Sequence, residues 1–263
     1  MLSVRCWLSD VFASRSASSP VNVFPLHYDS LFRKVISNMQ TEIIHSPGAA
    51  AARVILDPGE SISTEGGAMI AIGGEVAIET STHQKGKGGL IKGLKRLLGG
   101  ESFFLNHYTA GAGGGEVWLA QTLPGDMMKF ALEGQTLIVQ AGSFVACSAG
   151  VGMEVGWQGF KNLFSGESMF WLRIGGNGRL ILSSYGAIYP VQVNGEYIVD
   201  TGHIVAFDET LNYKLSKAGK SWWSSILGGE GLVCRFQGQG IVWCQSHNEP
   251  SFGHTIGPEL RPR

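Results

Sequence analysis

The sequence lacks the patterns that mark metal centres, zinc proteases and membrane-spanning helices. Its four cysteines form no CxxC pair, and its seven histidines form no HxH or HExxH pattern and do not lie at zinc-ligand spacing from the cysteines. These spacings predict no metal site and no bound cofactor. No run of about 20 apolar residues is present, which argues against a helix that spans a bilayer.

Charged residues are also scarce. Lys, Arg, Asp and Glu make up 16% of the 263 residues, against about 25% in average proteins. The formal net charge is −1, whereas a dedicated duplex-binding protein normally carries a basic excess that neutralises phosphates. The composition therefore argues against nucleic acid as a partner.

Candidate catalytic motifs are incomplete. GAGGGE at residues 111–116 has no P-loop lysine and leads into EVWLAQ, so we interpret it as a flexible hairpin tip. Ser61 in GESIS lacks the second glycine of a nucleophile elbow. Cys234 and Cys244 lie in two strand-like runs that could face each other across a hairpin, and buried reduced thiols are the favoured interpretation. The sequence predicts a noncatalytic protein.

The first 38 residues differ from the rest of the chain. MLSVRCWLSDVFASRSASSP is rich in Ser and Arg and contains one acid, Asp10. This composition is typical of a transit-peptide-like leader, and the alternative is an extension ahead of an internal start at Met39. We expect an N-terminal extension (1–38), a single β domain (39–247) and a C-terminal tail (248–263).

Glycine is abundant, with 38 residues, and it recurs in phrases that keep the same order three times. PGESI, EGQTL and NGEYI are followed by GAMIA, GSFVA and GHIVA, and then by LLGGES, LFSGES and ILGGEG. Such self-similarity is the signature of repeated structural units. The turn glycines of these units are Gly67, Gly100, Gly142, Gly166, Gly202 and Gly229.

Each unit contains short runs of Val, Ile, Leu and aromatic residues that end in glycine pairs, the pattern expected for β-hairpins. We therefore predict an all-β fold made of three hairpin units with pseudo-threefold symmetry. Joined edge to edge, the units would form a closed barrel-like or sandwich-like arrangement of about twelve strands, which leaves few open edges.

Three hydrophobic segments interrupt the units: KGKGGLIKGLKRLLGG (85–100), GWQGFKNLFSG (156–166) and GKSWWSSILGG (219–229). In the first, leucines and an isoleucine recur at helical spacing, and basic residues fall on the opposite face. Short amphipathic helices or loops at one rim would suit a membrane interface or a partner groove. The alternative is that the segments plug the barrel or pack against a second copy. The candidate contact residues are Leu90, Ile91, Lys92, Leu94, Lys95, Arg96, Leu97, Trp157, Phe160, Phe164, Trp222 and Trp223.

From Met39 to Ser246 the chain resembles the AIM24 family. The resemblance rests on phrases in constant order, among them VILDPGESI, KGLKRLLGGESFFLNHYTA, GEVWLAQTLPGDM and YGAIYPVQVNGEYIVDTGHIVAF. It implies an internally triplicated β fold like that of the tryptophan RNA-binding attenuation protein. It implies no catalytic residues, and the family's mitochondrial members are linked to organisation of the inner membrane.

Repeat, composition and resemblance together predict a noncatalytic binding or scaffold protein. We expect a homo-oligomer that associates peripherally with anionic membrane surfaces or membrane proteins. The corresponding location is the cytoplasm, peripheral to the inner membrane, or alternatively the mitochondrion. The alternative function, by fold analogy, is binding of a small ligand or single-stranded RNA.

Overall fold

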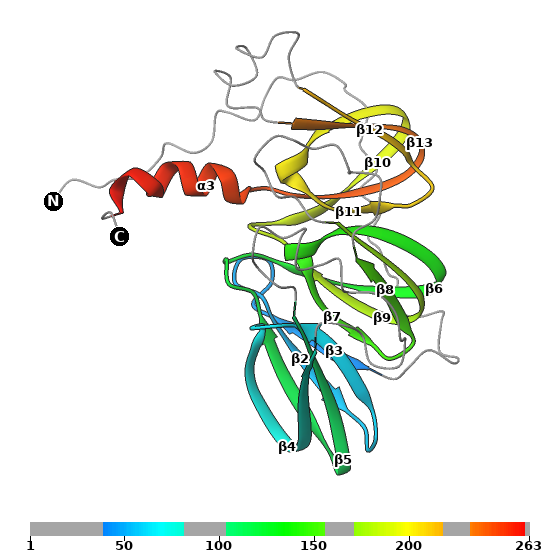
Figure 1. Ribbon diagram of the computed structural model, residues 1–263, viewed down its shortest axis with the longest axis vertical. Helices are drawn as coiled ribbons and strands as arrows, with labels where there is room; N and C mark the ends of the chain where they lie inside the picture. The colour runs from blue at the N-terminus through cyan, green and yellow to red at the C-terminus, as the bar shows by residue number, and fades with distance from the viewer. Residues whose placement is uncertain (1–38, 82–103, 156–170, 218–231, 261–263) are drawn as a thin grey trace, which may run out of the picture. The chain divides into compact units, whose positions relative to one another are not determined.

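Strands of the described chain join in one 13-stranded antiparallel sheet (Figure 1). The computed structural model describes residues 39–81, 104–155, 171–217 and 232–260. The strands are β1 (Gln40–Ile44), β2 (Ala51–Leu56), β3 (Ser61–Glu65), β4 (Met69–Ser81), β5 (Leu105–Ala120), β6 (Met127–Gln140), β7 (Phe144–Ser148), β8 (Val151–Val155), β9 (Trp171–Ser183), β10 (Ile188–Asp200), β11 (Ile204–Asp208), β12 (Asn212–Lys217) and β13 (Leu232–Gln245). The predicted all-β character is confirmed.

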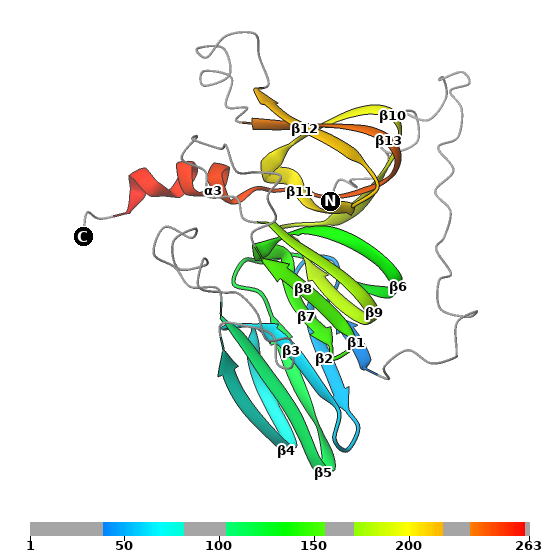
Figure 2. The same ribbon diagram turned by 45° about the vertical axis from the view of Figure 1, so that its right-hand side comes forward.

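Three long strands organise the sheet into three groups. β5 pairs with β2, β3 and β4, β9 pairs with β6, β7 and β8, and β13 pairs with β10, β11 and β12 (Figure 2). We call these sets the first group (β2–β5), the second group (β6–β9) and the third group (β10–β13). The first and second groups meet where β3 pairs with β7, and the second and third meet where β6 pairs with β11.

The hydrophobic core follows the alternation of the strands. In β2 the residues Ala52, Val54 and Leu56 are buried while their neighbours are half-buried, as expected when successive side chains point to opposite faces. Three clusters of buried side chains result, and each combines residues from more than one group. In the third cluster, Phe207 packs against Trp171 and Phe236 with ring centroids 5.6 and 5.0 Å apart.

The glycine-rich run at 111–116 is not a hairpin tip, because it lies inside the continuous strand β5. Gly114 has a φ of +68°, which bends the strand in a conformation that disfavours other residues. A Cβ on Gly115 would lie 2.4 Å from a methyl carbon of Val76 and 2.7 Å from the carbonyl oxygen of Gly73. Glycine here allows β4 and β5 to approach closely at a bend.

The predicted closed arrangement is wrong, because the sheet has two ends. Within the described ranges, β10 pairs with β13 alone and β4 pairs with β5 alone. Each group joins the next through one pair of strands, so β4 at one end of the series and β10 at the other have no partner outside their own group among the described strands. Closure would require a particular angle between successive groups, and the hydrophobic pattern of a strand does not specify that angle.

The C-terminal tail contains the helix α3 (Glu249–Ile256), which continues into a short 3-10 turn, η4 (Gly257–Glu259). Asn248 caps α3, because its side chain accepts a hydrogen bond from the backbone N–H of Ser251. Pro250 stands in the first turn, where its missing N–H has no helical partner to lose. No helix in the described parts of the chain is both long and apolar enough to cross a membrane.

Candidate functional site

The predicted contact residues lie outside the described residues, in the segments 82–103, 156–170 and 218–231. The predicted turn glycines Gly100, Gly166 and Gly229 lie in the same segments. The described structure does fix where each segment leaves the sheet and where it returns.

Each segment connects two neighbouring antiparallel strands. Ser81, the last residue of β4, is the register partner of Leu105, the first of β5. Val155 at the end of β8 pairs with Leu172 of β9, and Lys217 at the end of β12 pairs with Leu232 of β13. All three segments therefore start and finish at adjacent strand ends, each in a different group.

The three remaining turn glycines lie one turn ahead of a β-bulge. Gly142 lies in the 3-10 turn η1 (Ala141–Ser143), and Gly202 lies in η3 (Thr201–His203). Gly67 precedes β4 in a turn with a φ of +95°. In each group the strand that follows shifts register by one residue immediately after the turn.

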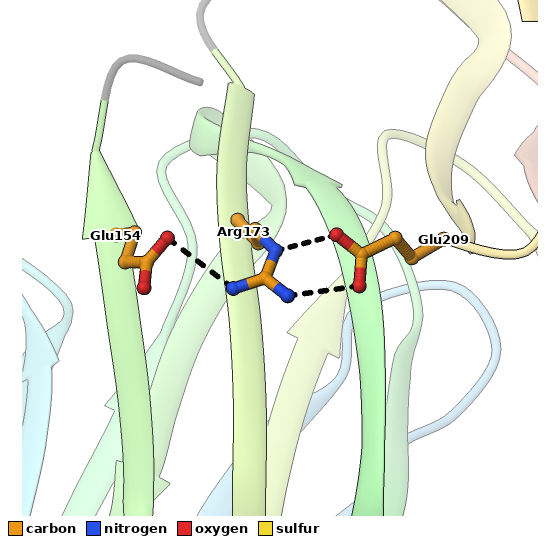
Figure 3. A network of polar contacts seen from close by, with 3 residues as sticks. All are labelled: Glu154, Arg173 and Glu209. Carbon is orange, nitrogen blue, oxygen red and sulfur yellow. Dashed lines mark hydrogen bonds and ion pairs between the residues drawn. The ribbon is translucent and has the colours of Figure 1, made fainter. Parts of the chain in front are cut away.

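Arg173 forms ion pairs with two carboxylates, those of Glu154 and Glu209 (Figure 3). Its guanidinium donates two parallel hydrogen bonds to Glu209, which follows β11, and a longer one of 3.3 Å to Glu154 on β8. The hydrogen bonds to Glu209 raise the pKa of Arg173, and the same bonds lower the pKa of Glu209. Because Arg173 lies in the second group and Glu209 follows β11 in the third, their ion pair links these two groups.

His107 on β5 has a serine hydroxyl at each ring nitrogen. Ser63 Oγ lies 2.9 Å from Nδ1 and Ser81 Oγ lies 2.7 Å from Nε2. A Ser–His contact is one requirement of nucleophilic catalysis, but Ser63 and His107 are both more than nine-tenths buried. A substrate could not reach the Ser63 hydroxyl, so we interpret the cluster as a buried polar network between β3, β4 and β5. Sequence reasoning missed it because only the strand register brings these residues together.

Among the carboxyl groups of the described residues, Glu65 at the end of β3 has the most displaced pKa. Burial, followed by the nearby carboxylate of Glu249, raises the pKa of Glu65 from 4.5 to about 8. Perturbed carboxyl groups often mark functional sites, although structural clusters also produce them. Within the described ranges, no group of three or more His, Cys, Asp or Glu side chains could hold a metal ion.

The cysteines correct one expectation of the sequence. Cys234 and Cys244 do not face each other across a hairpin, because both lie on the single strand β13. They and Cys147 are buried, reduced thiols. Burial raises the pKa values of Cys147 and Cys234 to about 12 and that of Cys244 to about 11, so these thiols stay protonated and unreactive.

Comparison with known proteins gives a consistent relationship. A protein of Streptococcus pyogenes serotype M6, described as uncharacterized, is 27% identical over 237 residues, which cover 88% of this chain and 95% of the relative. The crystal structure of a Streptococcus pyogenes protein superposes with a TM-score of 0.70 at 25% identity, over 84% of this chain and 100% of that chain. The sequence model of the family described as "Mitochondrial biogenesis AIM24" matches residues 41–247. Because this match covers most of the chain, the protein belongs to the AIM24 family.

Proposed function

We propose that this protein is a noncatalytic scaffold that self-associates and contacts anionic membranes, or proteins bound to them, through the segments 82–103, 156–170 and 218–231. The observation that carries the proposal is the anchoring of each segment between adjacent strand ends. A segment held in this way can vary in length and composition without disturbing the strand pairing on which the fold depends.

The composition of the segments supports a contact role. The first carries five Lys or Arg residues between Lys85 and Arg96 with no acid among them. The second and third place Trp157, Trp222 and Trp223 beside other apolar residues. Basic residues are attracted to anionic headgroups, and tryptophan favours the interface between headgroups and acyl chains.

The open sheet weakens the alternative that the segments are plugs. A plug needs the end of a closed barrel, and the described strands form an open sheet in which β1, β4, β8, β10 and β12 each pair with one neighbour. The described core is already built from strand residues of all three groups. Both observations favour segments that bind something other than the interior of their own domain.

We also infer that the three groups are copies of one structural unit, arranged as in the fold of the tryptophan RNA-binding attenuation protein. The support is the common position of the bulges, between Met69 and Ala71, between Phe144 and Ala146, and between Ile204 and Ala206. The contact segments then stand at corresponding places in the three units.

Co-sedimentation with phosphatidylglycerol vesicles tests the membrane contact. Reversing Lys92 and Lys95 to Glu removes two attractions of about 1 kcal/mol each, so vesicle binding should fall by roughly thirtyfold or more. The matched control reverses Lys129 and Lys214, two exposed lysines on β6 and β12. This control changes the net charge of the protein equally and should bind vesicles as the wild type does.

Three results would contradict the membrane proposal. The first is a wild type that does not bind anionic vesicles, and the second is an equal loss of binding in the two double variants. The third is a wild type that binds phosphatidylcholine vesicles as tightly as phosphatidylglycerol vesicles. Binding should also weaken as salt rises, because exposed charges are screened over about 10 Å at 0.1 M ionic strength. RNA filter binding on the same sample tests the alternative function, and a tight RNA complex without vesicle binding would favour it.

A further inference from the structure

The groups of this sheet are joined twice by the same kind of contact, which we call the joint. In the first joint, Ile62, Ser63 and Thr64 of β3 pair with Ser148, Cys147 and Ala146 of β7. In the second joint, Leu137, Ile138 and Val139 of β6 pair with Asp208, Phe207 and Ala206 of β11. Each joint pairs three residues of one group, on β3 or β6, with three residues of the next group, on β7 or β11. The second set of residues directly follows a bulge.

Two independent markers identify the corresponding residues in all three groups. A glycine with positive φ stands three residues ahead of Ile62, Leu137 and Ile198, at Gly59, Gly134 and Gly195. The bulge stands immediately ahead of Ala71, Ala146 and Ala206. By these markers, Ile198–Asp200 of β10 and Ala71–Gly73 of β4 are the two halves of a third joint. Within the described residues these two halves are not paired with each other.

Burial differs between formed and unformed joints at corresponding positions. Phe144 and Ile204, which start the bulge in the second and third groups, are at most 1% exposed, whereas Met69 in the first group is 41% exposed. Ile70, at the next position, is 54% exposed, whereas Val145 and Val205 are fully buried.

The other half of the joint shows the same difference. Ile62 and Leu137 are at most 2% exposed, whereas Ile198 is 44% exposed. The third group thus presents an apolar edge residue that its counterparts bury in a joint.

We propose that a second copy of this chain completes the third joint: β10 of one copy pairs antiparallel with β4 of the next. The two formed joints fix the register, which aligns Ile198 with Gly73, Val199 with Ile72, and Asp200 with Ala71. This inference rests on the proposed self-association and on the equivalence of the three groups. Because the two edges differ, the contact is head-to-tail, and it generates a ring or a linear chain of copies.

The two edges lack the residues that normally protect a free strand. Natural edge strands carry lysine, proline or inward charges that prevent pairing with another chain. Met69–Gly73 and Tyr197–Asp200 contain no lysine and no proline, and they carry one charge, Asp200. Asp200 accepts a hydrogen bond from the backbone of Gly202 in its own turn, so its carboxylate is already engaged.

Two variants that each block one edge test the head-to-tail arrangement. Ile70→Lys blocks the β4 edge, and Ile198→Lys blocks the β10 edge. Every joint between copies needs one edge of each kind, so either variant alone should be monomeric by light scattering. An equimolar mixture retains one free β10 edge and one free β4 edge, and should form a 1:1 dimer and nothing larger.

The same strands provide matched controls. Ile78 on β4 is 46% exposed and Tyr189 on β10 is 44% exposed, and both lie outside the third joint. Ile78→Lys and Tyr189→Lys should associate as the wild type does. All four substitutions are at exposed positions, and their melting temperatures verify that each variant is folded.

A cysteine pair tests the register without blocking either edge. One full-length variant carries Ile72→Cys and a second carries Val199→Cys. When the two variants are mixed and oxidised, they should form a disulfide-linked dimer. Ile78→Cys with Val199→Cys should form roughly tenfold less, because strand register fixes which Cβ atoms meet.

A wild type that is monomeric at tens of micromolar would overturn the inference, as would a mixture of blocked variants that stays monomeric. Association that survives in both blocked variants would place the contact elsewhere. Vesicle binding distinguishes this inference from the proposed function. If the double variant Lys92→Glu, Lys95→Glu no longer binds vesicles but still self-associates, then membrane binding and self-association are separate properties. Failure of one proposal then does not contradict the other.

Discussion

Arg173 on β9 and Glu209 after β11 form a two-pronged ion pair that bridges the second and third groups (Figure 3). Nη2 of Arg173 lies 3.0 Å from Oε2 of Glu209, parallel to the contact between Nε and Oε1. Such planar pairing is the strongest arrangement available to a guanidinium and a carboxylate. Both side chains are about one-third exposed, so water screens the pair in part.

Glu209→Gln should lower the stability of the folded domain by about 1 kcal/mol at pH 7, or roughly 2–4 °C in melting temperature. The arginine lowers the pKa of Glu209 in the folded state, so the stabilisation is present above the unfolded pKa near 4.5 and is lost as pH falls through the lower folded pKa. The difference between variant and wild type should therefore shrink in acid, as thermal melts at several pH values will show.

Glu154→Gln is the control for this pair. Glu154 contacts the same guanidinium through one hydrogen bond of 3.3 Å, and its side chain is 72% exposed. Exposed pairs of this kind contribute little, so the change in stability should stay within about 0.5 kcal/mol. Equal losses in the two variants would show that the parallel hydrogen bonds to Glu209 add nothing.

Glu65 gives the opposite dependence on pH. Its folded pKa of about 8 lies above its ordinary value of 4.5, so the folded state retains a proton that the unfolded chain releases. The stability contribution is present below pH 4.5 and is lost as pH rises toward 8. At high pH the folded protein bears the cost of an ionised, half-buried carboxyl, and Glu65→Gln removes that cost. The variant should therefore be more stable than the wild type by on the order of 1 kcal/mol at about pH 9.

Glu249→Gln separates the two causes of that shift. Burial is the larger cause and the Glu249 carboxylate is the smaller one, so removing the Glu249 charge should recover only part of the gain of Glu65→Gln. Melting curves of both variants between pH 5 and pH 9 make the comparison. A Glu65→Gln variant whose advantage does not grow with pH would show that this carboxyl is ionised in the folded protein.

The sequence predicted positive φ at the repeated glycines, but it did not show which of them lie in turns and which lie inside strands. Gly59 lies in the turn between β2 and β3 with positive φ, as its phrase indicated, whereas Gly134 and Gly195 have positive φ inside the strands β6 and β10, where the phrases had predicted turns. Gly114, Gly176 and Gly238 also have positive φ, and they too lie inside long strands, β5, β9 and β13. A tight turn and a sharply bent strand need the same backbone freedom, so composition does not distinguish them.

The candidate sites were predictable only where they are local in sequence. The contact segments are continuous runs, and their hydrophobic and basic pattern is visible without a structure. The His107 network joins Ser63, His107 and Ser81, which become neighbours through the registers of β3, β4 and β5. The third joint could not be predicted from the sequence, because it depends on which strand edges remain unpaired after the three groups assemble.

The glycines Gly59, Gly134 and Gly195 provide a prediction about backbone conformation alone. Their φ values are +77°, +93° and +101°, and a Cβ at any of them would meet no atom within 4 Å. Substitution by alanine therefore meets no steric contact and changes only the cost of the left-handed conformation, about 1 kcal/mol or more for a residue with a Cβ. Each Gly→Ala variant should melt roughly 2–4 °C below the wild type.

Gly48→Ala is the matched control, because a Cβ at Gly48 also meets no atom within 4 Å and its φ lies outside the left-handed region. This variant should be as stable as the wild type or slightly more stable, since alanine reduces the freedom of the unfolded chain. Asparagine tolerates positive φ better than alanine does, so Gly134→Asn should lose less stability than Gly134→Ala. If all three alanine variants melt at the same temperature as Gly48→Ala, the fold does not hold Gly59, Gly134 and Gly195 in the left-handed region. One of the two markers that align the three groups is then lost.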